Sequence, residues 1–308
     1  LEPGLAAEAV SPWERGIREL CRDYFRQLDG FLAEIVELAG SEARVFMVSD
    51  HGFRDTRHIF FVNSWLEREG HLRWAEGVDA REGDQFNVEG HADPASLFDW
   101  ERTTVCALTA GSVGLYVRSA AGPGEAGVPA AGYEAFCRRL GESLLREVDP
   151  ATGRQVVDRV LYRAEAFPGR YSDQAPDLSL ILRDGCSMSV MRSPAVLKPR
   201  EEVAGIHRPE GIFLARGRGL RQGLRLPPLA IADTAPTVLH SLGLEVPEDL
   251  EGAVAAAAFT PECLAAEPVR TGPPTEEPRS FPVQADDAAA AAEDEALIME
   301  RLKALGYL

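Results

Sequence analysis

The first part of the chain carries apolar side chains at helical spacing. Between residues 14 and 39 they recur with a period of about 3.6 residues, at Ile17, Leu20, Cys21, Tyr24, Leu28, Phe31, Leu32 and Ile35. This spacing places them on one face of a long amphipathic helix, which we expect to pack on a sheet. Gly40 and Ser41 then end the helix.

A short apolar run follows this helix. Residues 44–48 predict a buried strand that stops at the polar Ser49-Asp50-His51-Gly52. A helix, a short turn, a buried strand and then polar residues are the order expected of an open α/β sheet. In such sheets the chemistry gathers at the carboxyl ends of strands.

The rest of the chain continues this alternation of helices and strands. Residues 59–72 predict a helix around Trp65 and then a strand, and 75–98 read as loop. Further strands are predicted at 113–117, 156–162, 178–182 and 212–215, helices at 133–148 and 232–242, and a Gly- and Pro-rich turn or tip at 121–132. Residues 253–285 lack periodicity and predict a linker or strap, and 286–308 predict a C-terminal helix, Ala-rich over 287–305.

Composition narrows the class of protein. A net charge of −17 over 308 residues argues against nucleic acid as a partner, because a phosphate backbone repels such a surface. It does not exclude a small phosphorylated substrate, since a bound metal reverses the local field. No apolar run is long enough to span a membrane, and no secretory signal opens the chain.

The five cysteines form no Cys-x-x-Cys pair, so we expect free thiols and, with no signal at the start, a cytoplasmic protein. The chain opens without Met, however, which suggests that it was cut from a longer one and that a signal could have been removed.

The first candidate site is Ser49-Asp50-His51-Gly52-Phe53, directly after a predicted buried strand. Carboxylate oxygen and imidazole nitrogen are good ligands for zinc or manganese. Neighbouring residues of a strand point to opposite faces, so Asp50 and His51 converge on one metal only where the strand turns, and Gly52 permits such a turn. The alternative is an Asp that caps the turn and a His that packs.

The second candidate is His207, in Gly205-Ile206-His207-Arg208-Pro209-Glu210-Gly211. It also borders a predicted strand and lies far along the chain from Asp50. Metal sites in α/β enzymes gather ligands from several strand ends in this way. On its own, a His beside a glycine is more often a loop residue.

Together with other stretches in the same order, these segments resemble a known family. The stretches are Asp99-Trp100-Glu101-Arg102-Thr103, Gly114-Leu115-Tyr116-Val117, Asp149-Pro150-Ala151-Thr152-Gly153, Ala175-Pro176-Asp177-Leu178, Asp233-Thr234-Ala235-Pro236-Thr237-Val238-Leu239, Leu242-Gly243-Leu244 and Glu300-Arg301-Leu302-Lys303-Ala304-Leu305-Gly306-Tyr307. The chain resembles the type I phosphodiesterase/nucleotide pyrophosphatase branch of the alkaline-phosphatase superfamily, over most of its length from about Tyr24.

The resemblance implies a fold and a division of the chain. The fold is α/β, with three α/β/α layers around a mostly parallel central sheet and the N-terminal part missing. Residues 1–252 would be the C-terminal portion of that domain, with a loop-rich insertion at 75–132.

The resemblance also implies a hydrolase of phosphate esters with two divalent metals, usually zinc, with manganese as an alternative. Asp50 and His51 match the paired ligands of one metal and His207 a ligand of the other. The family's remaining ligands and its Thr or Ser nucleophile belong to motifs upstream of the Asp-His pair, and residues 1–43 hold no such motifs. We therefore expect the nucleophile to lie outside this chain and the chain alone to be inactive, because three ligands shared by two metals hold neither well.

Other residues of this chain that could serve as the nucleophile or as metal ligands fit these roles less well. The hydroxyl of Ser49 is expected to face away from the Asp50 side, and Thr56 is expected to lie in a polar loop with no helix start behind it. His58, His71, His91 and His240 match no family ligand, and Arg208 is more simply a surface ion pair than a phosphate ligand.

Other readings remain open from the sequence. The chain could belong to another branch of the superfamily, such as a sulfatase, a phosphonate hydrolase or a phosphomutase. It could be a non-catalytic scaffold that retains the fold, or a plain α/β domain in which the three ligands never meet.

Overall fold

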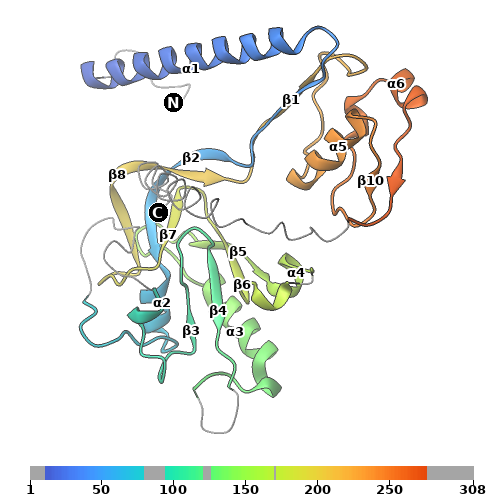
Figure 1. Ribbon diagram of the computed structural model, residues 1–308. Helices are drawn as coiled ribbons and strands as arrows, with labels where there is room; N and C mark the ends of the chain where they lie inside the picture. The colour runs from blue at the N-terminus through green and yellow to red at the C-terminus, as the bar shows by residue number, and fades with distance from the viewer. Residues whose placement is uncertain (1–10, 80–93, 121–125, 170, 276–308) are drawn as a thin grey trace, which may run out of the picture. The chain divides into compact units, whose positions relative to one another are not determined.

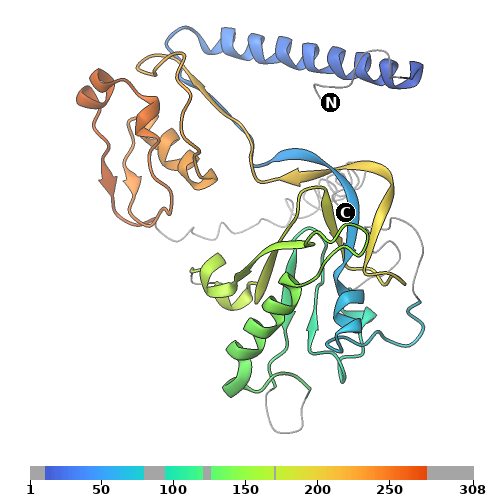
Figure 2. The same ribbon diagram turned by 180° about the vertical axis from the view of Figure 1, so that it is seen from behind.

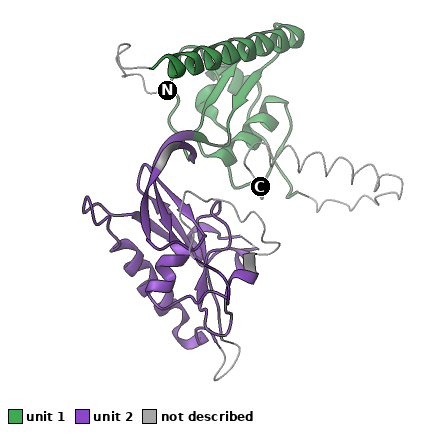
Figure 3. Ribbon diagram, turned by 90° about the vertical axis from the view of Figure 1, so that its left-hand side faces the viewer, with its two compact units in different colours: residues 1–52, 209–282 green, residues 53–208, 283–308 purple. Residues whose placement is uncertain are grey.

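The structure, a computed structural model, describes residues 11–79, 94–120, 126–169 and 171–275. The chain forms two compact units, each described here by itself (Figure 3). Unit 1 consists of residues 1–52 and 209–282, and unit 2 of residues 53–208 and 283–308. Along the described ranges, no helix is both long enough and apolar enough to cross a membrane.

Unit 1 contains the long helix α1 (Pro12–Ala39), which confirms the helix predicted from spacing (Figure 1). Ser11 and Glu14 form a capping box at its start, with Pro12 at the first helical position.

The expected packing of α1 on a sheet is not found, because no residue of the helix is buried. Nine of its large apolar side chains, from Trp13 to Leu38, are 39% to 87% exposed. The physical reason is one of size. The helix of 28 residues is about 42 Å long, whereas the described strands β1 and β9 have four residues each and span only about 13 Å.

Strands β1 (Val45–Val48) and β9 (Phe213–Arg216) pair in antiparallel fashion, with Val48 opposite Phe213. Both lie within one residue of their predicted positions. All four residues of β1 are half-buried, although their uninterrupted apolar run is typical of a fully buried strand.

The remainder of unit 1 packs around a small core of Leu220, Ala258 and Phe259. Its helix α5 (Thr234–Ser241) confirms the predicted late helix, and Gly243 follows it with a φ of 71°. Within 253–275, the described part of the predicted linker or strap, lie α6 (Pro261–Ala266) and β11 (Thr271–Gly272), which pairs in parallel with β10 (Val246–Pro247). The predicted C-terminal helix lies outside the described residues.

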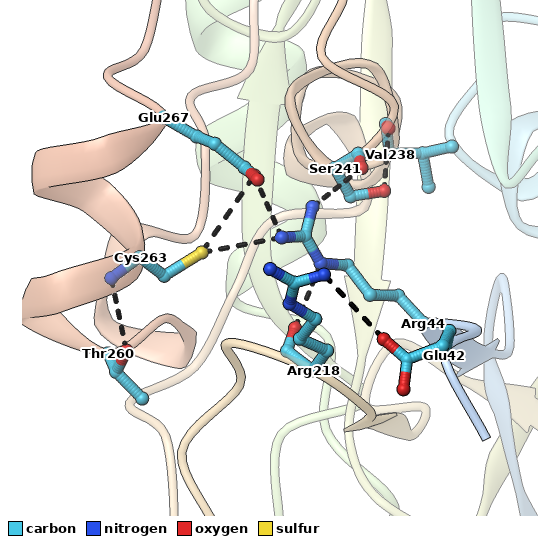
Figure 4. Close-up of polar contacts among 8 residues, drawn as sticks. All are labelled: Glu42, Arg44, Arg218, Val238, Ser241, Thr260, Cys263 and Glu267. Atoms are coloured by element: carbon cyan, nitrogen blue, oxygen red, sulfur yellow. Dashed lines mark hydrogen bonds and ion pairs between the residues drawn. The ribbon is translucent and has the colours of Figure 1, made fainter.

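Arg44, just before β1, ties these elements together (Figure 4). Its guanidinium donates hydrogen bonds to the carbonyl oxygens of Arg218 and Ser241, at 2.9 and 2.7 Å. It also lies 2.8 Å from the carboxylate of Glu267 and 3.4 Å from the thiol of Cys263. The entry to β1 is therefore fixed to α5 and α6 by one half-buried cation.

The described residues of unit 2 form two sheets, seen from opposite sides in Figures 1 and 2. One has the order β7-β2-β8, from β7 (Cys186–Ser189), β2 (Gly52–Phe61) and β8 (Leu197–Arg208). The other has the order β3-β4-β6-β5, from β3 (Val105–Cys106), β4 (Gly114–Val117), β6 (Leu178–Leu182) and β5 (Val157–Tyr162).

The helices in the described part of unit 2 are α2 (Val62–Arg68), α3 (Tyr133–Leu145) and the single turn α4 (Arg163–Ala166). Short 3₁₀ segments lie at Pro94–Leu97, Ala130–Gly132 and Ser172–Gln174. The helix predicted around Trp65 is confirmed as α2, but it follows a strand, β2, and residues 69–73 directly after it form no strand.

The mixed α/β class is confirmed, but a mostly parallel central sheet is not found in the described residues. β2–β7 and β10–β11 are parallel, whereas β1–β9, β3–β4, β4–β6 and β5–β6 are antiparallel. A parallel neighbour needs a long crossover, usually a helix. Between β5 and β6 the described residues form only the four-residue α4 and the short 3₁₀ segment Ser172–Gln174, so β6 returns in the opposite direction.

The core of unit 2 lies where α2 and α3 cover these strands, and Trp65, Leu66 and Leu144 are fully buried there. The side chain of Asn63 is buried too, and it bonds the backbone of Ala107 and Val190. Such a satisfied polar group fixes α2 against two other segments.

Candidate metal centre

Asp50 and His51 lie in the short bend that follows β1 in unit 1. The backbone N–H of His51 donates to Oδ1 of Asp50 at 3.0 Å. The other carboxylate oxygen, Oδ2, lies 3.4 Å from Nε2 of His51. The two candidate donor atoms therefore face one another, and their binding of a metal stays a prediction. The bend itself is at Asp50, and Gly52, to which the sequence assigned the turn, is already the first residue of β2.

The second ring nitrogen of His51 has a backbone partner. Nδ1 lies 3.1 Å from the carbonyl oxygen of Gly52. An N–H at Nδ1 donating to this carbonyl leaves the lone pair of Nε2 directed toward the Asp50 side. Metal-binding histidines usually have their other nitrogen held in this way.

Ser49 and Gly211 hold the bend in place. The hydroxyl oxygen of Ser49 accepts the backbone N–H of Ile212 at 2.8 Å, and the N–H of Ser49 donates to the carbonyl of Ile212 at 3.1 Å. A Cβ at Gly211 would lie 2.3 Å from Oγ of Ser49 and 3.3 Å from the carbonyl carbon of His51. The bend after β1 therefore requires a glycine at this position.

The geometry of this pair fits two ligands of one zinc ion. Ligand bonds of 2.0–2.2 Å at a tetrahedral angle separate two donor atoms by about 3.4 Å, which is the separation of Oδ2 and Nε2. The carboxylate of Asp50 is 80% exposed and thus open to further ligands. In the part of the chain that the structure describes, no group of three or more His, Cys, Asp or Glu is placed to hold a metal. The fit therefore extends to two ligands and no further.

His207 lies near the end of β8 in unit 2, with its side chain exposed. Its ring makes an edge-to-face contact with Phe53, with centroids 5.5 Å apart. Asp50 and His51 are thus brought together in unit 1, while the participation of His207 stays a prediction.

The other residues weighed from the sequence have different surroundings. Thr56 lies in strand β2 and not in the predicted polar loop, because this segment pairs within the sheet β7-β2-β8. It is buried, and its hydroxyl lies 3.2 and 3.3 Å from the carbonyl oxygens of His58 and Gly185. His71 packs edge-to-face on Phe136, and burial lowers the pKa of its imidazole. His240 is buried in unit 1, and His91 lies outside the described residues.

Sequence reasoning did not find the contact between Ser49 and Gly211. The signal was present, because a serine opens one candidate motif and a glycine closes the other. What was missing was the antiparallel register of β1 and β9, which brings the two motifs face to face.

A bent strand end that presents a carboxylate and an imidazole is typical of metal-dependent hydrolases with an α/β fold. The sequence of residues 12–209 matches the family described as type I phosphodiesterase / nucleotide pyrophosphatase. This match covers more than half of the chain, and the chain belongs to that family. No curated protein and no solved structure matches it. Membership supports a phosphodiesterase- or nucleotide-pyrophosphatase-like hydrolase that acts on small phosphorylated substrates, in a family that is generally metal-dependent.

Proposed function

We propose that this chain contributes part of a two-metal site for the hydrolysis of a phosphate ester. Asp50 and His51 hold the metal on the side of the nucleophile, and His207 holds the second. The observation that carries the proposal is the 3.4 Å separation of Oδ2 and Nε2, with Nδ1 of His51 against a backbone carbonyl.

Each residue has a definite task in this proposal. Asp50 supplies a carboxylate oxygen and negative charge, and His51 supplies Nε2 in a tautomer set by the carbonyl of Gly52. Ser49 and Gly211 position both by fixing the bend. The metals, when bound, supply Lewis-acid stabilisation of the phosphoryl oxygens and lower the pKa of the attacking hydroxyl.

Chain connectivity supports the assignment of His207. Gly211, whose backbone lies against Ser49, follows His207 by four positions, and four steps along the chain span at most about 14 Å. A second tether is Phe53, which contacts the ring of His207 and follows His51 by two positions. Chain connectivity therefore permits His207 to join the Asp-His pair in one site.

The nucleophile and the remaining ligands are, in this proposal, supplied by polypeptide upstream of this chain. The 308-residue chain alone then binds zinc weakly and has negligible activity on a nitrophenyl phosphodiester. Extending it at the N-terminus with the sequence encoded upstream restores turnover, and His51→Ala in the extended protein abolishes it. The control His58→Ala, a histidine outside the proposed site, retains it. Robust turnover by the 308-residue chain, lost in His51→Ala, would refute the external nucleophile.

A further inference from the structure

One loop of unit 1 carries four arginines within ten residues. They are Arg216, the last residue of β9, and then Arg218, Arg221 and Arg225. All four residues are exposed, and all four line one cavity of about 1420 Å³. This concentration of positive charge contrasts with the chain as a whole, whose net charge is −17.

Two leucines anchor the second half of this loop. Leu220 is buried in the small core of unit 1, and Leu226 packs against the same core. The backbone N–H of Arg221 also donates to the carbonyl oxygen of Ala258 at 2.8 Å. Arg221 and Arg225 therefore lie on a short segment that the core holds at both ends, with their side chains directed to solvent.

Two glycines hold the first half of the loop against its neighbours. Gly217 and Gly219 have φ angles of 133° and 75°, which favour glycine. A Cβ at Gly217 would lie 2.5 Å from the carbonyl oxygen of Ala43, and one at Gly219 would lie 2.5 Å from the sulfur of Cys263. The backbone around Arg218 is thus fixed by close packing, and its side chain takes no part in that packing.

The guanidinium groups of this loop have little acidic compensation. Among the ion pairs of the described residues, one involves Arg218, which lies 3.6 Å from Glu42 with both side chains more than 75% exposed (Figure 4). None involves Arg216, Arg221 or Arg225. Like charges grouped on one loop repel one another, so the arrangement favours an anion that is not part of the described chain.

The charges that line the cavity are separated along the ribbon of β1 and β9. The acidic ones, Asp50 and Glu210, lie beyond the end of the ribbon at Val48. Arg216 is opposite Val45, at the other end, and three residue steps along a strand span about 10 Å. The basic end of the cavity is therefore separate from the candidate metal centre.

We propose that the loop 216–225 binds a small molecule that carries two or more phosphate groups. The planar donors of a guanidinium bind two phosphate oxygens at once, and four such groups are more than a single phosphate needs. A long polyanion is a poorer ligand, because beyond the loop it meets a chain of net negative charge. An acidic peptide is poorer too, since each carboxylate carries a single charge whereas a phosphate carries more.

Calorimetric titration with inorganic triphosphate tests the proposal, in a buffer that contains EDTA so that no metal contributes. We expect the 308-residue chain to bind triphosphate at least about 10-fold more tightly than monophosphate, because it engages more of the guanidinium groups. The double variant Arg221→Gln/Arg225→Gln should lose at least about 10-fold in affinity, which is what one hydrogen bond to a charged group typically contributes. Arg221→Lys/Arg225→Lys should lose less, because lysine keeps the charge but not the paired donors.

A charge-matched control separates the loop from the general effect of charge. Arg138→Gln/Arg139→Gln removes the same two positive charges from the exposed side of α3 in unit 2. We expect this variant to bind triphosphate as wild type does. Thermal unfolding checks that every variant is folded, which we expect because all the substituted side chains are exposed.

Four results would overturn the proposal. The first is no measurable binding of triphosphate. The second is an equal loss of affinity in the two glutamine variants, which would show that net charge alone is responsible. The third is binding that appears only when zinc replaces EDTA, which would assign the ligand to the metal centre. The fourth is tighter binding of a short oligonucleotide or an oligoglutamate peptide. Because the titration contains no metal and measures no hydrolysis, its failure is distinguishable from failure of the proposed function.

Discussion

The hydroxyl oxygen of Ser49 accepts a hydrogen bond from the backbone N–H of Ile212 at 2.8 Å, although the two residues are 163 positions apart. This bond joins the end of β1 to the start of β9 at the point where Asp50 and His51 leave the strand. Gly211, immediately before Ile212, leaves no room for a side chain. The position of the two candidate ligands therefore depends on residues that carry no metal-binding chemistry themselves.

Gly211→Ala is expected to disturb both stability and metal affinity. The added Cβ would lie 2.3 Å from Oγ of Ser49 and 3.0 Å from its carbonyl oxygen, so the bend must shift. We expect a loss of about 1–3 kcal/mol in the free energy of unfolding, the usual cost of overpacking, and weaker zinc binding. Chemical denaturation and zinc titration measure the two effects. Gly205→Ala is the matched control, because nothing lies within 4 Å of its Cβ. Equal behaviour of the two variants would contradict this role of Gly211.

Asp149 and Arg183 form an ion pair in unit 2 in which both side chains are about 5% exposed, with 2.8 Å between Oδ2 and a guanidinium nitrogen. The guanidinium, followed by the backbone N–H of Ala151, holds the pKa of Asp149 well below its usual range. Asp149→Asn leaves a buried cation without its partner, so we expect a loss of about 3–5 kcal/mol in the free energy of unfolding at pH 7.

The pH dependence of this loss follows from the lowered pKa of Asp149. The pKa of this carboxyl is about 3.9 in the unfolded chain, and it is lower in the folded chain. The stability that the pair contributes is therefore present above about pH 5 and decreases as the pH falls toward the folded value. Urea denaturation at several pH values should show the difference between wild type and Asp149→Asn narrowing in acid. The control Asp23→Asn, in an exposed pair with Arg26, should change the free energy of unfolding little at any pH. A difference between wild type and Asp149→Asn that stays constant with pH would be inconsistent with the ion pair.

His240 should make unit 1 less stable in mild acid. Its side chain is 3% exposed, it packs against the ring of Phe259, and within the described structure its Nε2 has no hydrogen-bond partner. Burial, and then the nearby charge of Arg44, lower the pKa of the imidazole. The unfolded chain takes up this proton near pH 6.5, and the folded chain only at lower pH. The free energy of unfolding should therefore decrease as the pH falls below about 6.5.

His240→Phe removes this proton uptake and fills similar space. We expect near-wild-type stability at pH 7.5 and a weaker dependence on pH between 7.5 and 5.5, measured by thermal unfolding. Leu242→Ala, at an exposed position nearby, should keep the wild-type dependence. A dependence that is unchanged in His240→Phe would show that another group is responsible.

Elements with a strong local pattern could be predicted from the sequence. The spacing of apolar residues indicated α1, and the short apolar run at 178–182 indicated β6 with its observed bounds. β2 and β8 were not predicted, because charged and polar residues interrupt them. In β2 the exposed Phe53, Asp55 and Arg57 alternate with inward-facing residues. The overall composition of this segment is typical of a loop.

Contacts between residues far apart in the sequence were harder to predict. Whether two strands pair in a parallel or an antiparallel way depends on where the chain returns to the sheet. The apolar and polar pattern within β5 or β6 does not contain that information. The amphipathic α1 showed that one face must be covered, but not by what. At the candidate site, the proximity of Asp50 and His51 follows from adjacency in the sequence, whereas the contact of Ser49 with Ile212 depends on the pairing of β1 with β9.

The most direct test of the central claim, that Asp50 and His51 together hold a metal, is a zinc titration of the 308-residue chain by calorimetry. We expect weak binding that decreases in Asp50→Asn and in His51→Ala by at least the roughly 10- to 100-fold typical of lost support around a metal. The double variant should lose no more than the stronger single one, because both residues serve one ion. His58→Ala should bind as wild type does. Zinc binding that is unchanged in both single variants would contradict the claim.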